Sequence, residues 1–84
     1  MNNNDARSIF VGVDVGASHT KVAILDTEKK LIGHSVIKSG TDFTHSAEVC
    51  LKAALEMTHA SGEEIARCVS TGYGRKNVPF SQDT

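Results

Sequence analysis

The stretch Ile9–Lys21 reads IFVGVDVGASHTK and sets how the rest of the chain is arranged. Its apolar, β-branched first half ends at Asp14 and predicts a strand. A second apolar run, Val22–Leu25, follows the lysine directly and predicts another strand. The turn between the two runs carries the small residues Gly16–Ser18, so the sequence predicts a tight β-hairpin.

The residue types around this turn are those that a phosphate group and a Mg²⁺ ion require. Gly16 and Ala17 leave the backbone open to a ligand, because neither has a bulky side chain. Asp14 ends the first strand and offers a carboxylate for the metal ion or its water ligands. The candidate donors to phosphate oxygens are Ser18, Thr20 and Lys21. So short a motif is also typical of an ordinary hairpin whose turn happens to be Gly-Ala-Ser, and both interpretations stay open at this point.

Composition narrows the class of protein. The chain has 84 residues, a formal net charge of −1, 39 % apolar and 23 % charged residues, which predicts one small folded domain. The balanced charge provides no excess of basic residues for binding nucleic acid. No apolar run reaches the roughly 18 residues of a membrane-spanning helix, and residues 1–5 lack the pattern of a signal peptide. We expect a cytoplasmic protein with neither nucleic acid nor membrane as a partner, with a disordered tail over residues 1–7 and a folded unit over residues 8–84.

The two cysteines, Cys50 and Cys68, have neither the C-x-x-C spacing nor the nearby histidines of a metal site. Each lies in an apolar run, which predicts two buried, reduced thiols. Three of the four histidines are expected on the surface, whereas His19 falls within the hairpin turn itself.

The remainder of the chain predicts further strands and a helix. Strands are expected at about Ser8–Asp14, Lys21–Asp26, Leu31–Lys38 and Arg67–Ser70. A helix begins near Thr44, with Asp42 or Thr44 as its N-cap. The apolar stripe of this helix, at three- and four-residue steps, consists of Ala47, Cys50, Leu51, Ala54, Leu55 and Thr58. Ser61–Glu64 has the pattern of a capping box for one further helical turn, Glu63–Ala66.

The order of these elements predicts the topology. A strand–helix–strand connection is right-handed and brings the fourth strand parallel to an earlier one, most simply the first. The sequence therefore predicts an α/β fold with a mixed sheet in the order 3-2-1-4 and a helix on one face. The other face of the sheet and the outer edge of the fourth strand are left uncovered.

Two motifs, taken with their spacing, resemble a known family. Asp14–Lys21 (DVGASHTK) resembles the first phosphate motif of the actin, hexokinase and sugar-kinase superfamily. Thr71–Arg75 (TGYGR), together with Ser39–Asp42 (SGTD), is similar to the BadF/BadG/BcrA/BcrD ATPase family, which includes the activators of 2-hydroxyacyl-CoA dehydratases and the ATPase subunits of benzoyl-CoA reductases. The resemblance covers nearly all of Ile9–Phe80. It implies a partial actin/hexokinase-like (ribonuclease H-like) lobe, the N-terminal part of a larger two-lobed protein.

The resemblance also implies a site for ATP or ADP with Mg²⁺ in a cleft between the two lobes. Carried over to this sequence, Asp14 is the catalytic residue that holds the Mg²⁺ ion or its water. The implied nucleotide-binding residues are Gly16, Ala17, Ser18, Thr20, Lys21, Gly72, Gly74 and Arg75. Two positions depart from the family's pattern: Ala17 stands where many relatives carry Ser or Thr, and His19 is bulkier than the usual small residue.

In this family ATP hydrolysis drives low-potential electron transfer from a [4Fe-4S] cluster held by cysteines of two subunits. Those cysteines lie beyond the region that this sequence covers, and Cys50 and Cys68 match neither of them. The implied partners are a second ATPase subunit, in a homo- or heterodimer, and an acyl-CoA reductase or dehydratase component. The chain alone is expected to be inactive, as a fragment of the enzyme. Two alternatives remain: a small-molecule kinase of the N-acetylhexosamine type, against which TGYGR argues, and a non-catalytic half-lobe that binds a partner through its uncovered sheet face.

Overall fold

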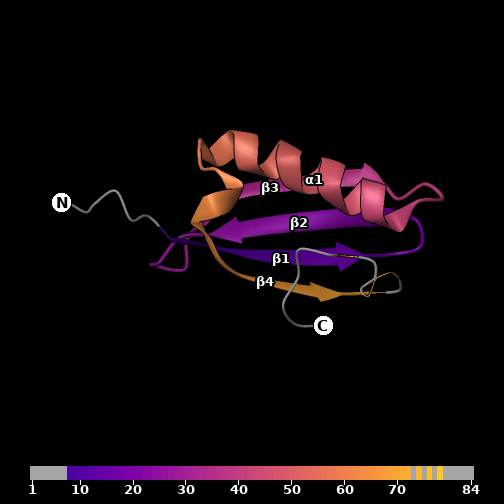
Figure 1. Ribbon diagram of the computed structural model, residues 1–84, viewed down its shortest axis with the longest axis horizontal. Helices are drawn as coiled ribbons and strands as arrows, with labels where there is room; N and C mark the ends of the chain where they lie inside the picture. Colours follow the sequence, from indigo (N-terminus) through magenta and orange to yellow (C-terminus); the bar gives the residue numbers. More distant parts are fainter. Residues whose placement is uncertain (1–7, 73, 75, 77, 79–84) are drawn as a thin grey trace.

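The computed structural model describes residues 8–72, 74, 76 and 78, which form a four-stranded sheet with a helix lying across it (Figure 1). The elements in chain order are β1 (Ile9–Val15), β2 (His19–Leu25), β3 (Leu31–Lys38), α1 (Phe43–Thr58), the 3₁₀ turn η2 (Gly62–Glu64) and β4 (Ile65–Thr71). The strands lie in the order β3-β2-β1-β4. Strand β2 is antiparallel to both of its neighbours, whereas β4 is parallel to β1. The predicted mixed sheet of order 3-2-1-4, with a helix on one face, is confirmed.

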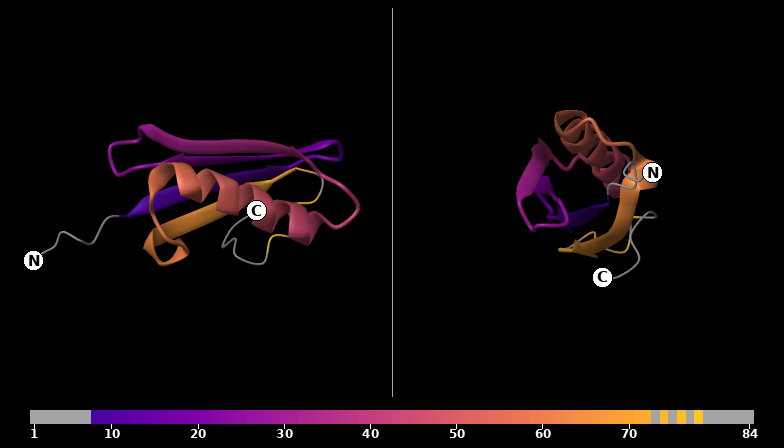
Figure 2. Two further views of the ribbon diagram at one scale, coloured as in Figure 1. Left: turned by 90° about the horizontal axis from the view of Figure 1, so that it is seen from above. Right: turned by 90° about the vertical axis from the view of Figure 1, so that its left-hand side faces the viewer.

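The side chains of β1 alternate between the two faces of the sheet, because successive side chains of a strand point to opposite sides. On one face Val11, Val13 and Val15 are at most 3 % exposed and belong to the core with Val22 and Ile24 of β2. Helix α1 covers this face and packs mainly on β3 and β2 (Figure 2). Burial of these β-branched side chains supplies the main driving force for folding in so small a domain.

The helix contributes small side chains to the core. Ala47, Cys50, Ala54 and Thr58 are buried, while Leu51 and Leu55 are partly buried, so the predicted stripe is confirmed. Small residues allow the helix backbone to approach the sheet closely. At Gly33 of β3 an added Cβ atom would lie 2.6 Å from the Ala54 carbonyl oxygen and 2.7 Å from the Thr58 Cγ2 atom.

Helix α1 begins one residue earlier than Thr44. Of the two expected caps the structure selects Asp42, whose Oδ1 atom accepts a hydrogen bond from the His45 amide at 3.1 Å. Its last helical residue is Thr58, since His59 adopts the left-handed conformation with φ of 59°.

The predicted helical turn Glu63–Ala66 is wrong in extent. The Ser61 amide donates to Glu64 Oε1 at 2.9 Å, as a capping box requires, but the helical segment is only the 3₁₀ turn. Ile65 and Ala66 already belong to β4, because Ile65 pairs with Ile9 and draws the chain into the sheet. Pairing with a neighbouring strand outweighs the local preference for a helical turn here.

The face opposite α1, called the open face below, carries a mixture of apolar, charged and small residues. It comprises Phe10, Gly12 and Asp14 of β1, Lys21 and Ala23 of β2, His34 and Val36 of β3, and Val69 and Thr71 of β4. Three of its apolar side chains, Phe10, Val36 and Val69, are 39 %, 56 % and 42 % exposed. Within the part of the chain that the structure describes, no helix has the length and apolar character needed to cross a membrane.

Two glycines on opposite faces of the sheet test how tightly α1 is packed. We expect Gly33→Ala to lower the free energy of unfolding by about 1–3 kcal/mol, because the new methyl group must push the helix backbone away. Gly12→Ala is the matched control on the open face, where an added Cβ atom meets nothing within 4 Å. Urea unfolding of the two variants measures the difference, and equal midpoints would contradict the close helix–sheet contact.

Candidate functional site

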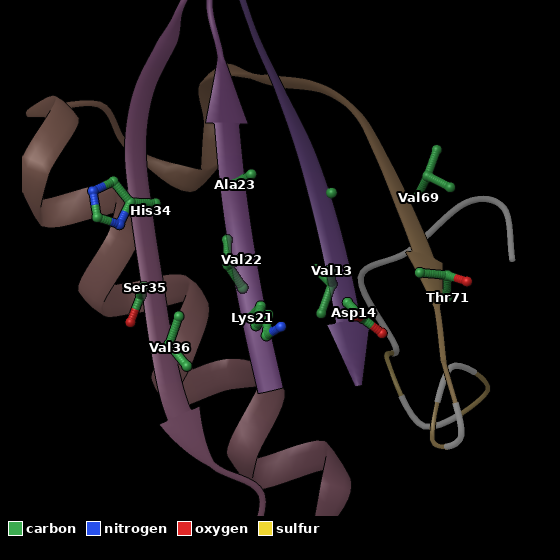
Figure 3. Close-up of a pocket in the computed structure, with 11 residues that line it drawn as sticks. Val13, Asp14, Lys21, Val22, Ala23, His34, Ser35, Val36, Val69 and Thr71 are labelled. Carbon is green, nitrogen blue, oxygen red and sulfur yellow. The ribbon is translucent and has the colours of Figure 1, made fainter. Parts of the chain in front are cut away.

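The residues that sequence analysis singled out converge at one end of the sheet, where β1 and β4 finish and β2 begins. Asp14 of β1 stands opposite Lys21 of β2 on one side and opposite Thr71 of β4 on the other. All three side chains lie on the open face and are exposed (Figure 3). Strand pairing alone therefore places a carboxylate between an ammonium group and a hydroxyl group. The same residues line a hollow of about 470 Å³ whose walls are otherwise mostly apolar.

The second motif packs directly against the first. Gly72 has a φ of +96°, a conformation that residues with a side chain rarely adopt. An added Cβ atom at this position would lie 2.5 Å from Asp14 Oδ1 and 2.7 Å from the Val15 carbonyl oxygen. The Gly74 amide donates to that same carbonyl oxygen at 2.8 Å. An added Cβ atom at Gly74 would lie 2.7 Å from Val15 Cγ1 and 2.9 Å from Phe43 Cγ, so neither glycine position has room for a side chain.

The hairpin turn borders the site on the other side. The Gly16 amide donates to the His19 carbonyl oxygen at 2.9 Å, and an added Cβ atom on Gly16 would lie 2.8 Å from that oxygen. Ala17 and Ser18 at the tip of the turn are exposed, as is His19. The turn is therefore a narrow loop with small, accessible residues at its tip, which is the form that close approach of a phosphate group requires.

The structure does not bring Thr20 together with Asp14 and Lys21. Thr20 is fully buried on the helix-covered face, and its Oγ1 atom lies 2.8 Å from Ser39 Oγ. Because adjacent residues of a strand point to opposite faces, Thr20 and Lys21 cannot line one pocket with their side chains. Direct contact of Thr20 with a nucleotide stays a prediction that this geometry does not favour. The other candidate, Arg75, lies outside the described residues.

Sequence reasoning missed two residues at this end of the sheet. Thr71 belongs to the TGYGR motif but is not among the predicted site residues, although β4 places it beside Asp14. Ser39 was quoted only as part of SGTD, yet its amide donates to the Ser18 carbonyl oxygen at 2.9 Å and ties the hairpin turn to the start of the helix connection. The register of β4 and the packing of this connection both depend on tertiary structure, so only the quoted motifs pointed to them.

A Mg²⁺ ion fits this end of the sheet as a partly hydrated ion. Asp14 offers one accessible carboxylate, and among the described residues no three His, Cys, Asp or Glu side chains gather into a metal site. Mg²⁺ is commonly held by one or two carboxylates, with water and phosphate oxygens completing its shell. Asp14 alone would therefore meet the protein's share of the ion's requirements, with water and phosphate oxygens as the remaining ligands.

The cysteines take no part in this arrangement. Cys50 and Cys68 are free thiols and at most 1 % exposed, which confirms the prediction of two buried, reduced thiols. The Cys50 sulfur lies 3.3 Å from the Ser35 carbonyl oxygen and 3.4 Å from the Thr20 carbonyl oxygen, and its single S–H hydrogen is shared between these two acceptors. Burial raises the pKa of both thiols above their ordinary value. Neither therefore has the accessible thiolate character of a ligand or nucleophile.

Comparison with known proteins places this geometry in a family. Residues 11–84 match the BadF/BadG/BcrA/BcrD ATPase family. The chain belongs to this family. The (R)-2-hydroxyglutaryl-CoA dehydratase activating ATPase of Acidaminococcus fermentans is 32 % identical over 68 residues, which cover 81 % of this chain and 26 % of that protein. The chain thus spans about a quarter of the length of the curated relatives it matches.

Solved structures give the same result for the fold. The crystal structure of A. fermentans (R)-2-hydroxyglutaryl-CoA dehydratase component A superposes with a TM-score of 0.81 at 28 % identity, over 90 % of this chain and 29 % of that one. The activator of the 2-hydroxyisocaproyl-CoA dehydratase from Clostridium difficile, with bound ADPNP, gives a TM-score of 0.77 at 28 % identity, over 92 % and 28 % of the two chains. The fold of this BadF/BadG/BcrA/BcrD family member is therefore that of the activator ATPases, and it is related to ATP-hydrolysing proteins.

Contact between the two motifs is testable at Gly72. We expect Gly72→Ala to destabilise the fold by about 1–3 kcal/mol, because the residue must leave its positive φ and the methyl group meets the Asp14 carboxylate. Gly62→Ala is the matched control, since an added Cβ atom there meets nothing within 4 Å. Thermal unfolding of both variants measures the effect. A Gly72→Ala variant as stable as Gly62→Ala would mean that the TGYGR loop does not rest on Asp14.

The two buried thiols predict a loss of stability at alkaline pH. Because their pKa values are raised in the folded state, the unfolded chain releases these protons first, from near the ordinary value of 9.0. The contribution of the two protonated thiols to the free energy of unfolding is complete below that pH. It is lost as the pH rises through their folded-state pKa values. Urea midpoints measured between pH 8 and 10 should fall more steeply for the wild type than for the Cys50→Ala/Cys68→Ala variant. Parallel pH profiles would show that the thiols are not responsible.

Proposed function

We propose that this chain supplies the phosphate- and Mg²⁺-binding part of an ATPase that couples ATP hydrolysis to low-potential electron transfer for 2-hydroxyacyl-CoA dehydration or benzoyl-CoA reduction. The observation that carries the proposal is the position of Asp14. It lies between Lys21 and Thr71 on the open face, with the backbone of Gly72 packed against its carboxylate. A phosphate group bound at the hairpin turn would meet a metal-binding carboxylate and a cation on adjacent strands.

Each residue has a definite task in this proposal. Asp14 holds the Mg²⁺ ion or one of its waters, and the ion when bound neutralises charge on the phosphate oxygens. Lys21 adds a second positive charge, while Gly16, Ala17 and Ser18 bring backbone and hydroxyl donors close to the phosphates. Gly72 and Gly74 let the backbone of the second motif pack against Asp14 and Val15 without side-chain bulk, and Arg75 is proposed as a further cation for phosphate. Catalysis of this kind consists of positioning and charge neutralisation, so no covalent enzyme intermediate is required.

The relatives support this assignment and favour one branch of it. Three similar proteins are named as activators of 2-hydroxyglutaryl-CoA, lactoyl-CoA and 2-hydroxyisocaproyl-CoA dehydratases, and one similar structure was solved with ADPNP bound. We therefore favour a dehydratase activator over a reductase subunit, and an ATPase over the kinase alternative. Its partners would be a second ATPase subunit and the dehydratase component, in the cytoplasm.

The same relatives suggest that further chain completes the ATPase. We propose that residues 8–84 form the N-terminal part of one lobe of a two-lobed protein. The ligands of a [4Fe-4S] cluster would belong to the remainder, since Cys50 and Cys68 are buried in this lobe. Sequencing the gene beyond the codon for Thr84 tests this. A reading frame that continues into a second phosphate motif and further cysteines supports the proposal. A stop codon directly after Thr84 would contradict it for this chain.

The open face favours a second candidate function, that of a non-catalytic interaction module. Phe10, Val36 and Val69 are exposed on the open face and, together with Gly12 and Ala23, line two mostly apolar hollows. Exposed apolar surface commonly marks protein contacts. Light scattering across a range of concentrations separates the two functions. Dimers that form regardless of Mg-ADP support the interaction module. Protection of the chain by Mg-ADP against thermal unfolding supports the ATPase.

Asp14→Asn is the decisive substitution for the proposed site. A ligand present at 100 times its Kd stabilises the protein that binds it by about 2.7 kcal/mol. We expect Mg-ADP to protect the wild type against thermal unfolding by this order, and to protect the Asp14→Asn variant far less because the metal loses its carboxylate. Asp26→Asn is the matched control at the opposite end of β2, where Asp26 Oδ1 accepts from the Glu28 and Lys30 amides. Equal protection of both variants would refute a Mg²⁺ role for Asp14.

A further inference from the structure

Ser39, in the connection between β3 and α1, is fully buried against the hairpin turn and uses all its polar groups. Its amide donates to the Ser18 carbonyl oxygen at 2.9 Å. Its hydroxyl donates to the Gly16 carbonyl oxygen at 2.6 Å. Its own carbonyl oxygen accepts from the Ser46 hydroxyl of α1 at 2.5 Å. One side chain and its backbone thus link two turn residues to the first turn of the helix.

The direction of the remaining hydrogen bond follows from the number of protons. A serine hydroxyl has one hydrogen atom, and Ser39 gives it to Gly16. The Thr20 hydroxyl, 2.8 Å from Ser39 Oγ, must therefore be the donor in their shared bond. The bonds run one way, from Thr20 to Ser39 to the Gly16 carbonyl oxygen. Both hydroxyls are fully buried, where an unsatisfied polar group would be costly.

This chain of bonds sets the orientation of the turn. The C=O and N–H groups of a trans peptide unit point in opposite directions, and the Gly16–Ala17 peptide bond is trans. Because the Gly16 carbonyl group points at the buried Ser39 hydroxyl, the Ala17 amide points away from it, at the exposed tip of the turn. An amide held in this way is preorganised to donate to an anion, since the protein need not rearrange when the anion arrives.

We propose that Ser39 is a positioning residue for the nucleotide phosphates, with Thr20 acting through it. Ser39 fixes the Gly16–Ser18 turn so that the Ala17 amide faces a phosphate oxygen. This inference rests on the proposed function of the turn as a phosphate site. It also gives Thr20 a task that its buried position allows: its hydroxyl orients Ser39 and does not touch the ligand.

The test measures the Kd for Mg-ADP in the 84-residue chain by isothermal titration calorimetry, well below the unfolding temperature. Ser39→Ala should raise the Kd about tenfold, the equivalent of one buried hydrogen bond. Thr20→Val should raise it less, and Thr20→Ser, which restores the hydroxyl, should recover most of the affinity. The matched control is Thr58→Val at the far end of α1, which removes a buried hydroxyl that donates to the Leu55 carbonyl oxygen at 2.8 Å. It should lower stability without changing the Kd.

A second readout needs no ligand. Amide hydrogen exchange at positions 16 and 39 reports on the bonds to His19 and Ser18. In Ser39→Ala it should accelerate about tenfold relative to the amides of α1. Unchanged exchange, or faster exchange with an unchanged Kd, would overturn the positioning role. If the wild-type chain does not bind Mg-ADP at all, a phosphate site formed by this lobe alone is refuted, and the phosphate role of Ser39 fails with it. The exchange result would then still decide whether Ser39 orders the turn.

Discussion

The structure depends on the double pairing of β1, whose side chains alternate between two environments. On one face Val11, Val13 and Val15 are buried in the core beneath α1. On the other face the same alternation leaves Asp14 exposed at the end of the strand. Pairing on both sides then determines the neighbours of that carboxylate, Lys21 from β2 and Thr71 from β4. Because a shift of one residue would exchange the two faces, the packing of the valines also holds the candidate site in register.

Sequence patterns predict those parts of the molecule that local chemistry determines. Apolar runs gave the strands of the meander, and the three- and four-residue steps gave the buried side of α1. The hairpin itself brought Asp14 and Lys21 onto paired positions. The prediction for Thr20 treats the motif as one set of donors, whereas strand alternation sends its side chain into the core, so its direct contact with a nucleotide stays an untested prediction. Attention to the two-residue period of β2 would have separated Thr20 from Lys21.

The features that escaped prediction depend on contacts between distant segments. The register of β4 includes an irregularity between Ile9 and Phe10, so the position of Thr71 beside Asp14 could not be counted from the strand's start. The bonds of Ser39 to Gly16 and Thr20 exist only because the β3–α1 connection packs beneath the turn. Such bonds leave no periodic signal. The result is an unusual distribution of polarity: hydroxyl groups are buried near the turn, while apolar side chains are exposed on the open face.

The parallel pairing of β1 with β4 has a consequence for the order of folding. The contacts of β1, β2 and β3 join neighbours in sequence, and so do the hydrogen bonds of α1, so they close short loops and form early. The β1–β4 ladder closes a loop that contains β2, β3 and α1, so its entropic cost is lower once those elements are in place. We therefore expect Asp14 to acquire its neighbours in this order: Lys21 with the hairpin, and Thr71 and Gly72 afterwards. A growing chain could thus pair Asp14 with Lys21 before Gly72 packs against the carboxylate.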